Sequence, residues 1–371
     1  MASGAVCPFC NATIEPEFPL CSSCGALLVG ASVGVTHFDS TAGLLPFVGR
    51  TDEMESIRRA AETALAGSKQ ILWISGRPGV GKTRLLSEAV STLLSQFHVT
   101  RSVCSSHGQY VPFRAFADLF RKAADIRLND SVENNLKQIQ KRLVVPEGFE
   151  VQHWDQRLVE LLGWQLGNGQ GIPATERRRQ TILSAKTALL GLARTRPTCL
   201  ILEDIQWMDA SSWELLDGIL NDFEDLPLLI CLTSREPWQP ARELPHECLT
   251  KIVLQPLDSE QTSDLLGAIF ASHTLPDFML DSLKKDQEWT PLYIDQLVRK
   301  LISQNIVKEG KDDWMQETPL DDELIPRELV NLIQSRIAGL GEGIRQILEV
   351  GAVIGAPFTS DLLERLQICS E

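Results

Sequence analysis

The stretch "ISGRPGVGKTRLL", residues 74–86, decides the fold. It fits the pattern G-x-x-x-x-G-K-[ST], with Gly76, Gly81, Lys82 and Thr83 at the fixed positions. An apolar run typical of a β-strand precedes the pattern, and an amphipathic helical pattern follows it. A strand, a glycine-rich turn and a helix in this order are the setting in which such a turn binds nucleotide phosphates. This setting disfavours the alternative, a glycine-rich turn that matches by chance.

Phosphate binding needs backbone N–H groups that point inward, and glycine takes the unusual dihedral angles that this requires. The helix that follows presents its positive N-terminal end to the anion. We expect Lys82 to reach the β and γ phosphates of ATP or ADP, and Thr83 to ligate Mg²⁺. The residues predicted to contact the nucleotide here are Gly76, Arg77, Pro78, Gly79, Val80, Gly81, Lys82, Thr83 and Arg84.

The composition is that of an ordinary globular protein with room for two or three domains. The chain has 371 residues, of which 43% are hydrophobic and 23% charged. Its formal net charge of -14 argues against broad, non-specific binding to nucleic acid. The N-terminal stretch lacks a secretory pattern, and no apolar run approaches the roughly 18 residues of a membrane span. We therefore expect a cytoplasmic protein with no membrane partner.

From residue 46 onward, short apolar runs alternate with helical patterns, which predicts an α/β fold with a parallel sheet. Residues 110–197 form a longer connection than a simple crossover needs and predict a helical insertion. After Pro256 the pattern predicts helices throughout. The five predicted strands are residues 70–75, 98–104, 198–204, 227–234 and 249–255.

A second chemical signal lies in "CLILEDIQWMD", residues 199–209, where Glu203 and Asp204 follow four apolar residues. Mg²⁺ needs a carboxylate at the end of a neighbouring strand, and hydrolysis needs an acid that orients water. By position, we expect Glu203 to hold the metal and Asp204 to serve hydrolysis, although the shorter side chain of Asp204 argues for the reverse. The alternative is a buried strand that ends in two solvated acids.

The longer stretch "LILEDIQWMDASSWELL" resembles the second motif of the STAND class of P-loop ATPases, relatives of AAA+ proteins. The resemblance is to the bacterial branch that accompanies adenylyl cyclases and transcriptional regulators, with Trp207 and Asp209 matched. "PFVGRTDEMESI" resembles the opening motif of the branch, which implies that Val48, Gly49 and Arg50 lie beside the adenine.

Three later stretches carry the resemblance toward the C-terminus. "LTSRE" resembles the sensor strand, which implies that Arg235 lies near the γ phosphate. "TPLYIDQLVRKL" resembles the Gly-Asn-Pro motif of a helical lid, with Pro291 at the proline position. Trp289 and Thr290 replace the usual Gly and Asn. "ELIPRELVNLIQSRIAGL" resembles the entry into a winged-helix domain.

Four cysteines near the start, Cys7, Cys10, Cys21 and Cys24, form two C-x₂-C pairs. Two such knuckles complete a tetrahedral thiolate site, which predicts a structural Zn²⁺ in a small zinc ribbon. An iron–sulfur site is the alternative. Disulfides would need an oxidising compartment, for which the sequence has no signal.

These signals predict a chain of five parts. They are a zinc ribbon (1–27), a linker (28–45), a P-loop ATPase domain (46–256), a helical lid (257–320) and a winged-helix-like segment (321–371).

The resemblance implies an ATPase that works as a signalling switch. Many ATPases have Asp then Glu at the two acids, and the reversed order here, with the shorter Asp204 second, predicts slow hydrolysis. Nucleotide state would control its conformation, and its partners would be ATP and either a protein partner or further copies of itself. Two alternatives stay open: an AAA+-type motor acting on nucleic acid or protein, and a non-enzymatic DNA-binding regulator that uses the ribbon and the winged helix. Nucleic acid is the less favoured partner, because residues 344–358 are apolar with a single arginine.

Overall fold

The fold is seen in a computed structural model, which forms two compact units. Among the described residues, the first unit contains Arg50–Pro78 and most of Lys82–Gln255, and the second contains 45–49, Gly79–Gly81 and parts of the chain after 255. The structure describes residues 45–126, 131–143, 154–164, 173–222, 225–240, 244–245, 247–270, 289–303, 306–309, 314–316, 334, 337 and 342–354.

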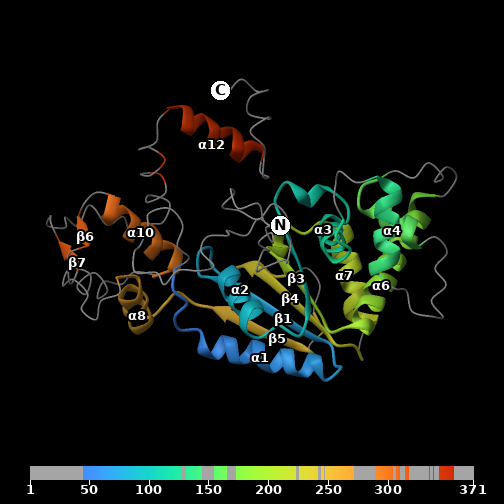
Figure 1. The fold of residues 1–371 in the computed structure, drawn as a ribbon, viewed down its shortest axis with the longest axis horizontal. Helices are drawn as coiled ribbons and strands as arrows, with labels where there is room; N and C mark the ends of the chain where they lie inside the picture. The colour runs from blue at the N-terminus through green and yellow to red at the C-terminus, as the bar shows by residue number, and fades with distance from the viewer. Residues whose placement is uncertain are drawn as a thin grey trace, which may run out of the picture. The chain divides into compact units, whose positions relative to one another are not determined.

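The first unit is built on a five-stranded parallel sheet with the order β2-β3-β4-β1-β5 (Figure 1). This confirms the predicted α/β class, and each strand boundary lies within one residue of its predicted position. The strands are β1 (Gln70–Gly76), β2 (His98–Val103), β3 (Thr198–Glu203), β4 (Leu228–Arg235) and β5 (Leu249–Leu254).

The strand order corrects one expectation about the acids. We expected Glu203 to end a strand next to the one that leads into the phosphate loop, but β4 lies between β1 and β3. Leu229 is the register partner of Gln70 on one side and of Cys199 on the other. In the same register Arg235 stands opposite Gly76, so β4 brings its last residue beside the start of the loop.

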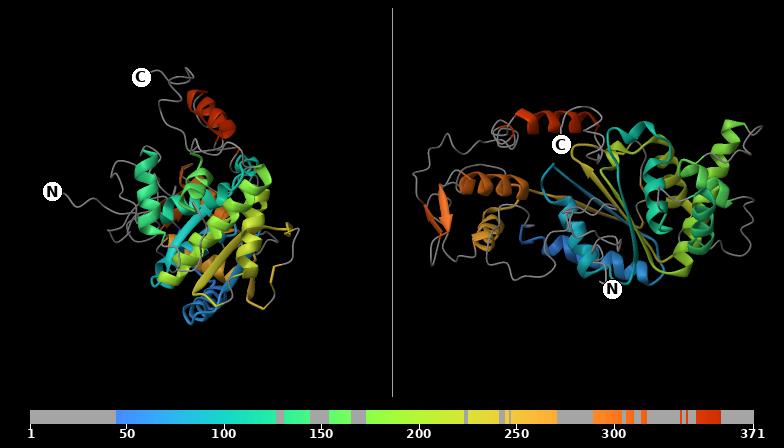
Figure 2. Two further views of the ribbon diagram at one scale, coloured as in Figure 1. Left: turned by 90° about the vertical axis from the view of Figure 1, so that its right-hand side faces the viewer. Right: turned by 45° about the horizontal axis from the view of Figure 1, so that its top comes forward.

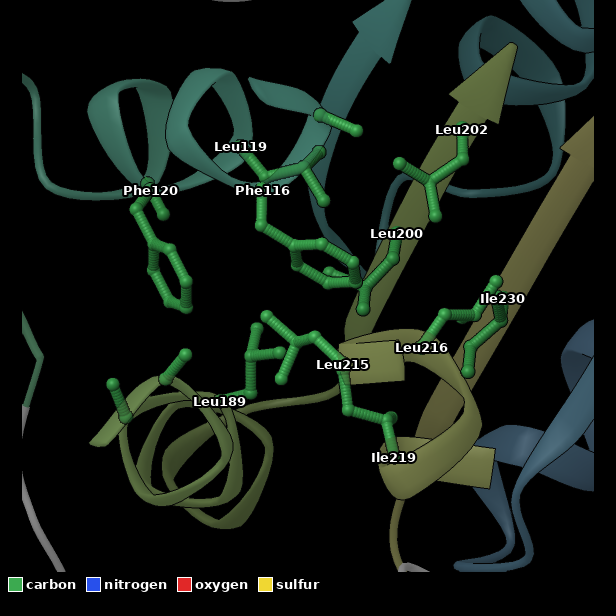
Figure 3. Packing of buried hydrophobic residues seen from close by; sticks show 14 of the residues in the cluster. Phe116, Leu119, Phe120, Leu189, Leu200, Leu202, Leu215, Leu216, Ile219 and Ile230 are labelled. Atoms are coloured by element: carbon green, nitrogen blue, oxygen red, sulfur yellow. The ribbon is translucent and has the colours of Figure 1, made fainter. Parts of the chain in front are cut away.

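One face of the sheet carries a large apolar cluster, shown in Figure 3. Successive side chains of a strand point to opposite faces, so Leu200 and Leu202 of β3 lie on this face. Three helices pack on it: α3 (Arg114–Ala123), α6 (Ala174–Thr195) and α7 (Ala210–Asp222). Burying one Leu or Phe side chain stabilises the fold by about 2 kcal/mol. The labelled members are Phe116, Leu119, Phe120, Leu189, Leu200, Leu202, Leu215, Leu216, Ile219 and Ile230.

The opposite face is covered by α1 (Thr51–Leu65) and α2 (Lys82–Thr92), which contact each other and β1 (Figures 1 and 2). The side of α1 that is buried combines Ile57 with three alanines, and their small side chains let the helix lie close to the strands. Because α2 begins at Lys82, its N-terminus directly follows the glycine-rich turn.

The predicted helical insertion between β2 and β3 is confirmed where the structure describes it. It consists of the short 3₁₀ turn η1 (Gly108–Tyr110), then α3, α4 (Val132–Arg142), α5 (Trp154–Leu161) and α6. The Ser131 side chain caps α4 by accepting a hydrogen bond from the N–H of Asn134.

The second unit contains two helices whose apolar faces form a separate core. On the second of these helices Tyr293, Ile294, Leu297, Val298 and Leu301 are buried, whereas Ile302 is partly buried. The elements after residue 256 are α8 (Ser259–Phe270), α10 (Pro291–Ser303), β6 (Val307–Glu309), β7 (Trp314–Gln316) and α12 (Glu342–Ile354).

The expectation of helices alone after Pro256 was wrong. The strands β6 and β7 pair in antiparallel register, with Val307 opposite Gln316. Each strand has three residues, which is too short for a periodic pattern to appear in the sequence.

Several predicted features lie outside the described residues. These are the zinc ribbon with its four cysteines, nearly all of the linker, and most of the winged-helix-like segment. Within the described ranges, no helix has both the length and the apolar character needed to cross a membrane.

Candidate active site

The phosphate loop has the backbone that anion binding requires. Gly79 and Gly81 have φ angles of +79° and +105°, which L side chains rarely adopt. Within the second unit, a Cβ added at Gly79 would lie 2.9 Å from Cβ of Leu292. A non-glycine residue at this position would therefore meet both backbone strain and a clash. Alternating dihedrals of this kind turn successive N–H groups toward one concave surface.

The ammonium group of Lys82 is folded back onto the start of the loop. Its Nζ donates to the carbonyl oxygens of Gly76 (2.8 Å) and Arg77 (3.1 Å). Burial lowers the pKa of Lys82, while the negative charge of Asp204 opposes this shift. The charge of Arg235 also lowers the Lys82 pKa. The cation is therefore held next to the turn, with carbonyl groups as its partners.

The first acid, Glu203, is bound at both carboxylate oxygens. Its Oε2 accepts a hydrogen bond of 2.6 Å from the hydroxyl of Thr83, the first-turn threonine of α2. Its Oε1 accepts from Nε of Arg101, which comes from β2. The Glu203 side chain is 3% exposed. Since β3 is extended up to this residue, its carboxylate stays at the buried end of the strand.

The second acid, Asp204, leaves the strand in a left-handed turn with φ +52° and ψ +46°. Asp tolerates this conformation better than most residues. Its N–H donates to Oγ1 of Thr233 (3.0 Å), and its Oδ1 accepts from Nε2 of Gln206 (2.9 Å). Nε of Arg235 lies 3.7 Å from the same oxygen. In the part of the chain that the structure describes, Oδ2 makes no hydrogen bond, and the side chain is 31% exposed.

Gln206 links this acid to the end of β4. Its Oε1 accepts from the backbone N–H of Arg235 at 3.2 Å, while its Nε2 donates to Asp204. The two bonds fix the amide and so restrict the Asp204 carboxylate. The fold thus brings Lys82, Asp204 and Arg235 into one electrostatic group at the carboxyl ends of β1, β3 and β4.

Comparison with known families agrees with this geometry. The model of the AAA ATPase domain matches residues 46–231, which is half of the chain. The chain belongs to the AAA ATPase domain family. The matched part of the AAA ATPase domain includes the phosphate loop, Glu203 and Asp204.

A curated relative extends over more of the chain than the domain match. It is the uncharacterized protein R02095 of Rhizobium meliloti (strain 1021), 25% identical over 352 residues. The alignment covers 91% of this chain and 32% of the relative, so the chain spans about a third of that protein's length.

Three solved structures are similar at low identity. Cdc6p from Pyrobaculum aerophilum has a TM-score of 0.43 at 14% identity, over 72% of this chain and 65% of that one. The Walker-type ATPase PABY2304 of Pyrococcus abyssi has a TM-score of 0.40 at 11%, over 87% and 89%. Drosophila ORC, solved bound to DNA, has a TM-score of 0.42 at 11%, over 89% and 80%. Scores of this size assign no function to the chain.

The stretch that resembles an opening motif, residues 46–57, contains two residues with left-handed backbone. Arg50 has φ +63° and is buried. Its guanidinium donates to the carbonyl oxygen of Gln255 (2.7 Å) and to Glu53 (3.1 Å), which ties the start of α1 to the end of β5. Gly49, with φ +61°, forms the turn before it, and Val48 packs on the core of the second unit. An adenine contact for Val48, Gly49 and Arg50 stays a prediction.

The stretch that resembles a lid motif begins with a capped helix. Thr290 Oγ1 accepts a hydrogen bond from the N–H of Tyr293 (3.2 Å), so Thr290 caps α10. Pro291 then occupies the first helical position, which suits its fixed φ and missing N–H. Thr is a good N-cap residue, so Thr290 provides a stable start for this helix.

Trp207 and Asp209, which follow the two acids in the stretch 199–209, make contacts that stabilise the fold. Asp209 is buried, and its carboxylate accepts from the N–H groups of Phe113 (2.8 Å) and Ser212 (2.8 Å). These bonds join the start of α3 to the start of α7. Trp207 packs against the large apolar cluster.

The oxygen donors in the described site suit Mg²⁺. Thr83 and Glu203 supply a hydroxyl and a carboxylate that already meet at 2.6 Å, and Mg²⁺ uses few protein oxygens together with waters and phosphate oxygens. In the described residues, no group of three or more His, Cys, Asp or Glu side chains could hold a metal ion. The zinc prediction concerns Cys7, Cys10 and the second C-x₂-C pair, which lie outside those residues.

Two residues of this site, Arg101 and Gln206, are not predicted by the sequence patterns. Arg101 is a charged residue inside a predicted strand, and that is the signal that could have found it. Gln206 lies two residues after Asp204 within the acid motif. Nothing in the sequence states which acid each of them contacts, because those contacts depend on strand order and turn geometry.

Proposed function

We propose that the AAA ATPase domain binds Mg-ATP at residues 76–84 and hydrolyses it slowly, as a STAND-type switch. The observation that carries the proposal is the different setting of the two acids beside one phosphate loop. Glu203 is buried and bonded at both oxygens, whereas Asp204 is partly exposed and, among the described residues, has one oxygen without a hydrogen bond.

In the proposed binding step, Lys82 exchanges its carbonyl partners for the β and γ phosphates. The loop N–H groups and the N-terminus of α2 hold the same phosphates. Thr83 and Glu203 would hold Mg²⁺, directly or through water. When bound, Mg²⁺ supplies positive charge to the phosphate oxygens.

In the proposed hydrolytic step, Asp204 orients the attacking water through Oδ2, the oxygen to which no described residue donates. Gln206 keeps the other oxygen fixed, and Arg235 supplies positive charge near the γ phosphate. The aspartate has a shorter reach than a glutamate, and Arg235 and Gln206 already hold it on one side. We therefore expect turnover to be slow, as a switch requires.

The coupling to conformation is proposed from the second unit. Three residues of the phosphate loop, Gly79–Gly81, belong to that unit, where the carbonyl oxygen of Gly79 accepts from the N–H of Leu292 in α10 (3.3 Å). A ligand that changes the conformation of this loop also moves the Gly79 carbonyl group, to which the first turn of α10 is hydrogen-bonded. A nucleotide shifts the population of conformers only by its difference in affinity for them, and the γ phosphate can supply that difference.

The test is the nucleotide found in the purified protein, measured together with single-turnover and steady-state hydrolysis. Retained ADP with slow turnover supports the switch. An empty site with rapid multiple turnover supports the alternative, a motor of the AAA+ type. A chain that binds no ATP at all overturns both.

A structural zinc at Cys7, Cys10, Cys21 and Cys24 remains part of the proposal. Elemental analysis should find one zinc per chain, because four thiolates complete one tetrahedral site. Replacing Cys7 and Cys10 by Ser should remove it. Iron in its place would show that the site is an iron–sulfur centre.

A further inference from the structure

Arg101 contacts Glu203, and the steps proposed above assign this contact no role. It lies in β2, and its Nε donates to Oε1 of Glu203 in the adjacent strand. The side chains are 16% and 3% exposed, so this is a largely buried ion pair. A guanidinium is planar and rigid, so a carboxylate oxygen bound to it cannot rotate freely.

The position of Arg101 is itself secured from two sides. Its backbone carbonyl accepts from Nζ of Lys122 in α3 at 2.7 Å. Its NH1 lies 3.4 Å from the hydroxyl of Ser87, which in turn donates to the carbonyl of Thr83 at 2.9 Å. Arg101 therefore contacts the acid strand and, at Ser87 in its second turn, helix α2. These are the two elements that supply the oxygens proposed for Mg²⁺.

We propose that Arg101 is a positioning residue for Mg²⁺, which holds Glu203 so that its Oε2 meets the hydroxyl of Thr83. This inference rests on the proposed function. Without Arg101, the carboxylate keeps one bond from the part of the chain that the structure describes, that from Thr83, and can turn away from the metal. Partners of metal-holding residues orient them, and their loss typically weakens metal binding about 10–100-fold.

The test uses the full chain, with Mn²⁺ as the probe for the metal and ATP as the nucleotide. Mn²⁺ affinity is titrated by electron paramagnetic resonance in the presence of ATP, and ATP affinity is measured separately in EDTA. For Arg101→Met we expect Mn²⁺ affinity to fall about 10–100-fold, with ATP affinity in EDTA unchanged. Arg101→Lys restores the charge but not the planar geometry, so it should recover part of the loss.

The matched control is Arg178→Met. Arg178 also makes an ion pair between two elements, with Glu214, but both side chains are exposed and far from the loop in sequence. Breaking it should leave Mn²⁺ affinity at the wild-type value, since exposed ion pairs contribute little.

Three outcomes decide the proposal. Wild-type Mn²⁺ affinity in Arg101→Met overturns it, and so does an equal loss of ATP affinity with and without metal, which is what a purely structural ion pair produces. If Arg101→Met does not fold, Arg101→Lys decides: weakened Mn²⁺ affinity supports the proposal, and wild-type affinity overturns it. Failure of the proposed function is separate, because wild-type protein would then bind no ATP.

Discussion

The two acids at the end of β3 are neighbours in the chain but lie in opposite environments. Glu203 is in extended backbone, buried, and bonded to Arg101 and Thr83. Asp204 is in a left-handed turn, partly exposed, and bonded at one oxygen by the neutral amide of Gln206. The comparison teaches that one peptide step at a strand end separates a carboxylate suited to hold a cation from one that can reach water.

The largest effect should come from Asp204→Asn. This change keeps the shape but removes the charge that orients water, so we expect single-turnover hydrolysis to slow about 100–1,000-fold. Mg-ATP affinity should stay near the wild-type value, because a transition-state contact alone is lost. If Mg-ATP affinity falls instead, and Glu203→Gln affects turnover alone, the two roles are reversed.

Lys82→Ala tests the phosphate grip of the loop, on which the proposed roles of both Glu203 and Asp204 depend. It removes the charge that faces the β and γ phosphates, and we expect ATP affinity to fall about 100-fold, since contacts to charged groups are worth about 1.5–3 kcal/mol. Calorimetric titration with ATP in EDTA and in Mg²⁺ should show the loss in both conditions. Unchanged affinity would remove the phosphate loop from the proposed site.

Glu203→Gln should weaken Mg²⁺ binding and leave the metal-free binding of ATP unchanged. The amide keeps the side chain's size, but its neutral group holds Mg²⁺ less well, so we expect the gain in ATP affinity on adding Mg²⁺ to shrink about 10–100-fold, as much as expected for Arg101→Met. Binding in EDTA is the internal control and should not change. An unaltered response to Mg²⁺ would show that Glu203 is a buried structural partner of Arg101.

Gln206→Ala should give the smallest effect, and it tests how the Asp204 carboxylate is held. The change removes a single hydrogen bond to the carboxylate, worth about 1 kcal/mol, so turnover should slow roughly fivefold. ATP and Mg²⁺ affinities should be those of the wild type. Gln206→Glu is the companion variant: it keeps the length but places a like charge beside Asp204, and it should slow turnover further.

The candidate site was predictable from sequence in its local parts. Hydrophobic periodicity and one motif predict the phosphate loop, the five strands and the two acids. These signals are local, because glycine dihedral preferences and apolar alternation depend on residues that are close together in the chain. The pair β6 and β7 was missed because three-residue strands carry no period. Arg101 was missed because its partner is 102 positions away in the chain.

The sequence by itself determined the chemistry available at this site: a glycine-rich turn, one lysine, one threonine, two acids and an arginine. Only the tertiary structure decided how they combine. It placed β4 between β1 and β3, which sets Arg235 opposite Gly76. It also paired Arg101 with Glu203 and Gln206 with Asp204 through hydrogen bonds. The physical reason is that dihedral preference and hydrophobic pattern act between near neighbours. The partner of a buried charge depends on which strands pair, and side-chain packing over the whole sheet determines that pairing.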